Sequence, residues 1–182
     1  MKTPTSFPIL TLLCAITTAC TIPPTVAIPA PNRKSPPTFP EMRVKNLMDE
    51  TKHFPREFPA DRTLLLIAFQ PGQQEILDDW SQRLKLDQLG AAQWLELPVI
   101  DDPGAFLRWF VDTGMRSGIP NPETRARVFT IYAPRVEFVR SLGLPDTTQV
   151  HIAVADRDGR IITHVSGSWT ARKEERLREV LK

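Results

Sequence analysis

The chain contains two cysteines, Cys14 and Cys20, and both lie within the first 20 of its 182 residues. A cysteine can act as a thiolate nucleophile, pair in a disulfide or bind a metal. From residue 21 onward the chain has no cysteine and therefore no thiol for any of these reactions. The role of the N-terminal segment therefore decides which sulfur chemistry the protein keeps.

The N-terminal segment has the parts of a secretory signal. Lys2 supplies an early positive charge, and residues 9–16 form a short apolar core after Pro8. This core is far shorter than the roughly 20 residues that a transmembrane helix needs. We therefore expect residues 1–19 to be removed during export, and Cys14 to leave with them.

Residues 16–19 read Ile-Thr-Thr-Ala before Cys20, and this run resembles a bacterial lipobox, with a small residue directly before the cysteine. Thr17 departs from the motif, which usually has leucine or another aliphatic residue there. The resemblance implies cleavage after Ala19 and acylation of Cys20, which would anchor the protein at the cell envelope, on the periplasmic face of a membrane. The alternative is an ordinary signal cut near Ala19, which would leave a soluble secreted protein.

Proline is enriched ahead of the folded part. The chain has 18 prolines, about twice the usual ~5% share, and seven of them lie in residues 21–40. Such a segment cannot bury enough apolar surface to offset its ordering entropy, so we expect an extended spacer. We divide the chain into a signal peptide at 1–19, the lipidated cysteine and linker at 20–45, and a folded domain at 46–182. A short helix is expected at 41–52.

The three histidines, His53, His151 and His164, make a weak case for a metal site. His151 and His164 flank a predicted hairpin turn. A four-residue loop would pair them across the ladder, whereas a bulge at Gly159 would place them on different faces. Even a facing pair lacks a nearby carboxylate ligand. We therefore expect structural or solvent-facing histidines and no metal.

Arginines gather between residues 108 and 140, and the opposing charges within that stretch are Asp112, Glu123 and Glu137. A guanidinium group suits carboxylates and phosphates because it donates two parallel hydrogen bonds. Residues 114–122 are expected to break the preceding helix and to present an arginine beside its tryptophan. The candidate surface for an anion or a protein partner therefore consists of Trp109, Arg116, Arg125 and Arg127. A solvated basic face is the alternative.

Other catalytic patterns are missing from the sequence. No serine has the histidine and acid context of a catalytic triad, and no glycine-rich phosphate loop is present. We interpret the adjacent acidic pairs at 78–79 and 101–102 as a helix surface and a loop with a helix cap. A formal net charge of +2 is too small to indicate nucleic-acid binding. We expect no catalytic residue and no cofactor.

The folded part alternates strands and helices. Residues 63–69 form a continuous apolar run that is typical of a strand buried on both faces. Further strands are predicted at 93–100, 128–132, 150–155 and 160–165. Helices are predicted from 73 to about 84, from 103, at 134–142 and from about 170. Strands joined by helices form parallel crossovers, and the final hairpin adds antiparallel strands, so we predict an α/β fold with a mixed sheet.

The buried strand with its loop and helix, and above all the hairpin VHIAVADRDGRIITHVSGSW at 150–169, resemble the thioredoxin-like fold over residues 63–182. The resemblance is greatest to peroxiredoxin-type chains and to thioredoxin-like ATP synthase assembly factors. It implies a three-layer α/β/α sandwich with a mixed sheet that ends in a C-terminal β-hairpin and helix.

Two departures separate this chain from the redox members of that fold. Redox members present a cysteine in the loop after the first core strand, where this chain reads Gln-Pro-Gly-Gln-Gln at 70–74. They also place a cis-proline directly before the penultimate strand, where this chain has Asp-Thr-Thr-Gln at 146–149. We therefore predict a membrane-anchored, non-catalytic binding, assembly or chaperone-like factor. The alternatives are an oxidoreductase-related enzyme that uses a partner's thiol or a cofactor, and a binder of small anionic ligands.

Overall fold

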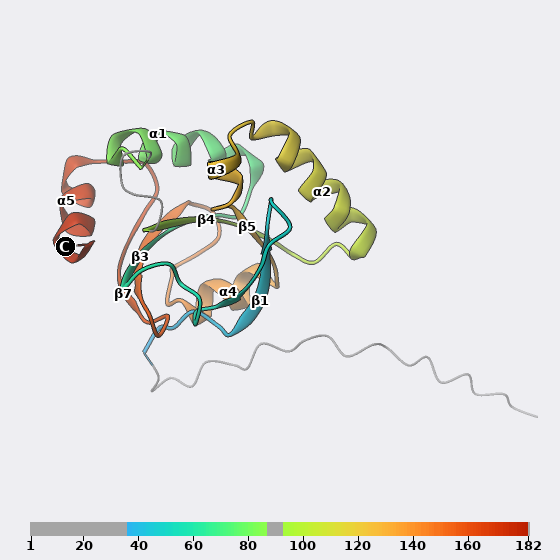
Figure 1. Cartoon of the computed structure of the whole chain (residues 1–182). Coiled ribbons are helices and arrows are strands. Elements are labelled where there is room, and N and C mark those ends of the chain that lie inside the picture. Colours follow the sequence, from blue (N-terminus) through green and yellow to red (C-terminus); the bar gives the residue numbers. More distant parts are fainter. Residues whose placement is uncertain (1–35, 87–92, 182) are drawn as a thin grey trace, which may run out of the picture.

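The computed structural model describes residues 36–86 and 93–181, which form a seven-stranded mixed sheet in the order β2-β1-β5-β4-β3-β6-β7 (Figure 1). Its strands are β1 (Met42–Asn46), β2 (Thr51–Phe54), β3 (Arg62–Ala68), β4 (Trp94–Ile100), β5 (Phe129–Tyr132), β6 (His151–Asp156) and β7 (Ile161–Ser166). The helices are η1 (Pro71–Gln73), α1 (Gln74–Leu84), α2 (Ala105–Gly118), α3 (Pro122–Arg125), α4 (Arg135–Ser141) and α5 (Ala171–Leu181). The predicted signal peptide, Cys20 and most of the predicted linker lie outside the described residues.

Strand β3 lies inside the sheet, between β4 and β6, and both of its faces are apolar. It pairs in parallel with β4 and antiparallel with β6. Leu65 and Ile67 belong to the hydrophobic cluster on one face, and Leu64 and Leu66 belong to the cluster on the other. All four side chains are buried. The prediction of a strand buried on both faces is confirmed.

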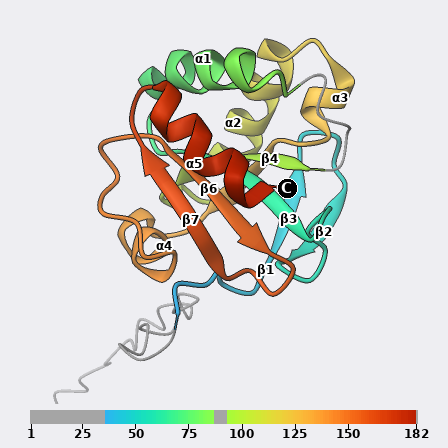
Figure 2. The same ribbon diagram turned by 90° about the vertical axis from the view of Figure 1, so that its left-hand side faces the viewer.

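Helices cover both faces of the sheet. Leu77 and Trp80 of α1 and Leu177 of α5 are buried in one hydrophobic cluster, and Phe138 of α4 is buried in the other. Figure 1 shows α1 above the sheet and α4 below it, and Figure 2 shows α5 crossing β6 and β7. The predicted three-layer sandwich with a mixed sheet and a C-terminal hairpin and helix is confirmed.

The prediction of a short helix at 41–52 is wrong, because this segment forms the hairpin of β1 and β2. Burial alternates along β1, with Val44 and Asn46 buried and Arg43 and Lys45 exposed, which is the period of a strand. The Asn46 side chain closes the turn, because its Oδ1 accepts hydrogen bonds from the backbone N–H of Met48 (3.0 Å) and from that of Glu50 (2.9 Å).

The folded domain also begins before residue 46. Thr38 forms a bridge with Arg160, and the backbone N–H of Phe39 donates to the carbonyl of Gly159 at 2.7 Å. The Phe39 ring is 1% exposed and packs edge-on against Phe58 and Phe138. The predicted boundary is therefore corrected: residues 38–45, assigned to the linker, belong to the domain core and the sheet.

Helix α2 continues to Gly118, so the break expected at 114–122 begins later than predicted. Gly114 and Gly118 lie in open space, where helical backbone forms at the modest cost of a missing side chain. Ile119 is extended and ends the helix, because the following Pro120 disfavours the helical conformation of the residue before it. Within the described part of the chain, no helix combines the length and hydropathy needed to cross a membrane.

The β6–β7 hairpin is confirmed, and its register decides where the two histidines lie. Asp156 Oδ1 accepts hydrogen bonds from two backbone N–H groups of the turn. Gly159 has a positive φ of 79°, and Pro55 lies so close to it that a side chain at this position would clash. Beyond an irregularity at Val154/Ala155, His151 pairs with Ser166 and Ala153 pairs with His164. The histidines are therefore diagonal neighbours on one face, neither directly paired nor on different faces.

Candidate functional site

The loop after β3, in which redox members are expected to present a cysteine, contains a buried glutamine amide. Gln73 ends the short helix η1 and is 6% exposed. Its Oε1 accepts a 2.7 Å hydrogen bond from the backbone N–H of Phe69, and its Nε2 lies 3.5 Å from the carbonyl of Thr147. Both ends of the amide contact backbone groups, so Gln73 fastens the loop to the sheet and to residues 146–149.

Residues 146–149 form a turn held by the carboxylate of Asp146. The carboxylate accepts hydrogen bonds from the backbone N–H groups of Thr148 (2.8 Å) and Gln149 (3.3 Å), and from the Thr148 hydroxyl. These bonds, that from the Thr148 side chain above all, lower the pKa of Asp146. The two segments in which this chain departs from redox members therefore lie next to each other in space.

His151 completes this cluster from the start of β6. The side chain is fully buried, with Nδ1 2.8 Å from the Ser166 hydroxyl and Nε2 2.8 Å from the carbonyl of Asp146. A carbonyl can only accept, so Nε2 carries the proton and Nδ1 accepts from Ser166. Burial lowers the pKa of His151, which keeps the ring neutral and fixed. We assign His151 a structural role.

The second histidine does not extend the cluster into a metal centre. The ring centroid of His164 lies 6.5 Å from that of His151, and burial also lowers the pKa of His164. Across residues 36–86 and 93–181, no three histidine, cysteine or acidic residues lie close enough to hold a metal ion.

Glu96 is a buried carboxylate under the first turn of α1. It lies on β4, opposite Leu66 of β3, and is 6% exposed. Its Oε1 accepts a hydrogen bond from Gln74 Nε2 at 3.2 Å. Burial raises its pKa, and the nearby negative charge of Asp78 adds to that effect, whereas the bond from Gln74 opposes it. Glu96 is therefore a buried acid whose environment favours the protonated form.

The predicted arginine surface is dispersed. Arg116 donates to the carbonyl of Leu47 at 2.8 Å and to Asp49 at 3.1 Å, so it ties α2 to the β1–β2 turn. Arg125 Nη2 lies 3.4 Å from the Pro120 carbonyl, and its Nε is buried and has no hydrogen-bond partner within the described chain. The guanidinium of Arg127 stacks over the ring of Trp94.

Acidic residues from outside the arginine-rich stretch neutralise much of its charge. Arg135 forms an ion pair with Asp101, and Arg108 forms one with Asp102. Hydrogen bonds from Arg135 lower the pKa of Asp101, and those from Arg108 and Gly104 lower that of Asp102. Asp102 also accepts from the backbone N–H of Gly104, and Asp101 accepts from that of Arg135 at the start of α4. The predicted cap is corrected, because the N-cap residue of α2 is Gly104. The balance of charges inferred from residues 108–140 alone was incomplete.

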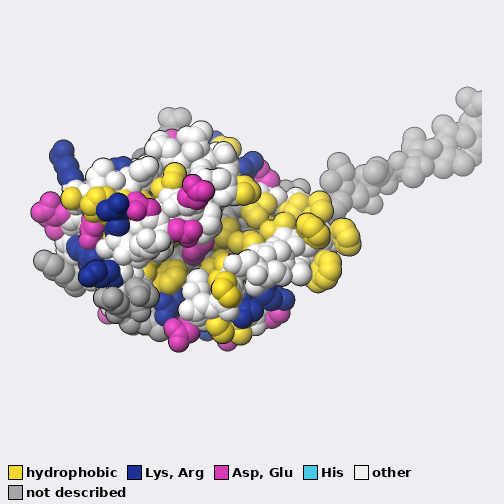
Figure 3. All heavy atoms as spheres, turned by 90° about the horizontal axis from the view of Figure 1, so that it is seen from above, with side chains coloured by type: hydrophobic (Ala, Val, Ile, Leu, Met, Phe, Trp, Pro, Cys, Tyr) yellow, Lys and Arg dark blue, Asp and Glu magenta, His cyan; other side chains and the backbone are white. Residues whose placement is uncertain are grey.

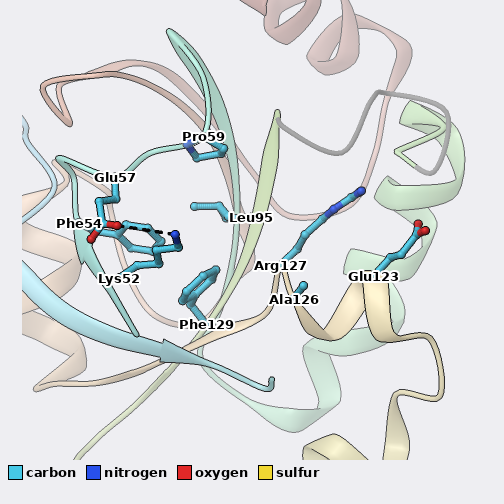
Figure 4. Close-up of a pocket in the computed structure, with 9 residues that line it drawn as sticks. All are labelled: Lys52, Phe54, Glu57, Pro59, Leu95, Glu123, Ala126, Arg127 and Phe129. Atoms are coloured by element: carbon cyan, nitrogen blue, oxygen red, sulfur yellow. Dashed lines mark ion pairs between the residues drawn. The ribbon is translucent and has the colours of Figure 1, made fainter. Parts of the chain in front are cut away.

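A groove of about 420 Å³ lies between β2, β4, β5 and α3 (Figure 4). Its floor is apolar and consists of Phe54, Leu95 and Phe129. The ion pair between Lys52 and Glu57, with N and O 3.6 Å apart, borders one side, and Glu123 and Arg127 border the other. An apolar floor between charges of both signs suits an extended peptide segment better than a small anion.

Sequence reasoning missed two of these features. Glu96 leaves a local signal, because it is a charged residue inside the otherwise apolar strand at 93–100. The groove leaves none, since its walls come from segments that are far apart in the chain. Of the predicted surface, Arg127 borders the groove, whereas Arg116 is bonded inside the domain and Trp109 is 63% exposed on α2.

No family model matches the chain, and no curated protein matches it. Solved structures do match. A candidate electron transfer protein of Aquifex aeolicus aligns over 81% of this chain and 99% of its own, with a TM-score of 0.57 and 8% identity. BsSco, a member of the Sco family of cytochrome c oxidase assembly proteins, aligns over 80% and 92%, with a TM-score of 0.52 and 10% identity.

The thioredoxin domain of a thiol-disulfide oxidoreductase from Bacteroides vulgatus aligns over 81% of this chain and 99% of its own, with a TM-score of 0.51 and 10% identity. The chain therefore has the thioredoxin-like fold. At this level of identity the likeness concerns the fold, and no residue role follows from it. The narrower resemblance to peroxiredoxin-type chains and ATP synthase assembly factors stays a prediction.

Proposed function

We propose that this thioredoxin-fold chain is an exported lipoprotein, anchored through Cys20, that works without thiol chemistry as a binding, assembly or chaperone-like factor at a membrane. The observation that carries the proposal is Gln73. Its buried amide lies in the loop where redox members are expected to present a cysteine, and it is bonded at both ends to backbone groups. An amide in that position supplies neither a nucleophile nor an electron carrier.

The groove supports a binding role. Its floor is formed by side chains that the sheet holds in place, and the charged rim offers hydrogen-bonding partners for a peptide backbone or for side chains of either sign. A groove with such an apolar floor can bind an extended segment of another protein. A role in assembly or in protecting a client requires this non-covalent contact. It does not require a covalent bond to be made or broken.

The proposal is tested by photo-crosslinking in the native membrane. A photoreactive residue replaces Glu123 at the groove rim, and a matched control replaces Glu175, which is exposed on α5. We expect protein adducts from position 123 and few from position 175. Equal adduct yields from both positions would argue against binding in the groove.

A second measurement addresses the enzymatic alternative. The purified chain from residue 20 with Cys20→Ser, which has no thiol, should not reduce insulin disulfides or peroxide beyond the rate of the added reductant alone. Turnover without an added thiol protein would show that the domain carries redox chemistry and would overturn the non-catalytic assignment.

A further inference from the structure

The first two turns of α2 carry an exposed apolar surface, which we call the α2 tip: Phe106, Leu107, Trp109 and Phe110. Their exposed fractions are 76%, 48%, 63% and 65%. The rings of Phe106 and Trp109 lie beside each other, with centroids 6.5 Å apart. Figure 3 shows hydrophobic side chains gathered at the end of the molecule where α2 begins. Such a concentration of large exposed apolar side chains marks a contact surface.

The side of α2 that carries Arg108 and Asp112 holds the helix to the domain, and the α2 tip points away from it. The Tyr132 hydroxyl donates to Asp112 at 2.7 Å, and the Arg108 guanidinium lies over the Tyr132 ring. No α2 residue is fully buried. Beyond the tip the outward positions become small or polar, with Gly114, Ser117 and Gly118 exposed. The apolar surface is therefore confined to the end of the helix.

The size of the tip disfavours a second copy of this chain as its partner. A whole aromatic side chain buries about 150–250 Å², so the four side chains, scaled by their exposed fractions, offer about 400–600 Å². A standard protein interface buries about 800 Å² on each partner. A small protruding tip that contains tryptophan and phenylalanine suits the boundary between lipid headgroups and acyl chains, where aromatic side chains are enriched.

With the proposed anchor in place, a weak contact between the α2 tip and lipid is sufficient to orient the domain. Residues 20–35 precede the described chain, and 16 residues span at most about 55 Å when extended. A compact domain of this size is roughly 40 Å across, so the tether permits the α2 tip to reach the bilayer. Anchoring also raises the effective concentration of the tip at the membrane surface.

We propose that the α2 tip inserts into the membrane interface and thereby orients the domain on the bilayer; this inference rests on the proposed anchoring at Cys20. The contact is apolar, because the charge nearest to the tip, that of Arg108, is paired with Asp102. Binding should therefore depend little on salt and should not require anionic lipids.

The test uses the chain from residue 20 with Cys20→Ser, which has no acyl chain, and phosphatidylcholine vesicles. We expect it to sediment with the vesicles and the Trp109 emission to shift to the blue. Combined Phe106→Ser, Trp109→Ser and Phe110→Ser should lower the partition coefficient at least about tenfold, because interfacial binding scales with the apolar area inserted. Val136→Ser, at a 62% exposed position on α4, is the matched control and should leave it unchanged.

Three outcomes overturn the inference: no sedimentation of the parent chain, equal sedimentation of the triple variant, or a self-association that the triple substitution abolishes. All substituted side chains are exposed, and equal thermal unfolding of the variants shows that folding is intact. Because the acyl chain is absent, failure here leaves the anchor untouched, and palmitate labelling of Cys20 tests the anchor separately.

Discussion

At the scale of single residues, Glu96 is held in an environment that favours its protonated form. Burial raises its pKa above the ordinary 4.5, so the folded state binds a proton more tightly than the unfolded state does. The stabilisation from that proton is complete below pH 4.5 and is lost as the pH rises through the folded-state pKa. Above the folded-state pKa, the ionised Glu96 therefore disfavours the folded state.

Glu96→Gln removes the ionisation and keeps an acceptor for the amide of Gln74. We expect the variant to gain about 1 kcal/mol over the wild type at pH 8 and to lose this advantage near pH 4. Urea denaturation across this range measures the difference. Glu75→Gln, at an exposed position on α1, serves as the control. An advantage that is independent of pH would contradict the assignment of Glu96 as a buried, titrating acid.

At the scale of elements, the first strand and the residues before it complete the core. Phe39 packs against Phe54, Phe58 and Phe138, and β1 joins β2 to β5. Without residues 36–45 the face of the sheet covered by α4 would lose the Phe39 ring, and β5 would become an exposed edge.

A chain that begins at residue 46 should therefore fail to fold, whereas one that begins at residue 36 should unfold cooperatively. Phe39→Ala in the longer chain should cost about 3–5 kcal/mol, the usual loss for a buried phenylalanine. Circular dichroism and urea denaturation measure both effects. Met48→Ala, at a 44% exposed position in the β1–β2 turn, is the control. A stable fold from residue 46 would show that this strand is dispensable.

At the scale of the whole molecule, the chain divides its tasks between an N-terminal segment and a domain. Every cysteine belongs to the segment, and the domain supplies the sheet, the groove and the α2 tip. If Cys20 is acylated, the protein keeps one cysteine sulfur, as a thioether. The covalent lipid anchor then belongs to the N-terminal segment, and the surface that would bind a partner belongs to the domain.

We expect the protein to incorporate radiolabelled palmitate in a bacterial host that processes lipoproteins, and Cys20→Ser to abolish the label. The variant lacks the sulfur that would carry the acyl chains, so it should take up no label. Cys14→Ser, which changes the residue inside the predicted signal, should keep the label. Unlabelled wild-type protein would favour the secreted alternative.

Much of the fold could be predicted from local patterns. The apolar run at 63–69 indicated a strand buried on both faces, and the turn at 156–159 indicated a hairpin, because side-chain period and turn chemistry are properties of neighbouring residues. The short alternation in β1 was overlooked, and the glycines of α2 were taken for a break. Both errors arose where the local preference for helix or strand is weak and tertiary packing decides the secondary structure.

The sequence by itself determined that residues 21–182 offer no cysteine thiol, because the positions of Cys14 and Cys20 depend on no contact. The tertiary structure alone decided how the candidate site is made. Gln73 reaches Thr147, 74 residues away, and Arg116 reaches Leu47, 69 residues away. Such contacts depend on the order of strands in the sheet, which places distant segments together and which no local period records. For the same reason Arg116, which was expected to contribute to a partner surface, is bonded to the domain itself.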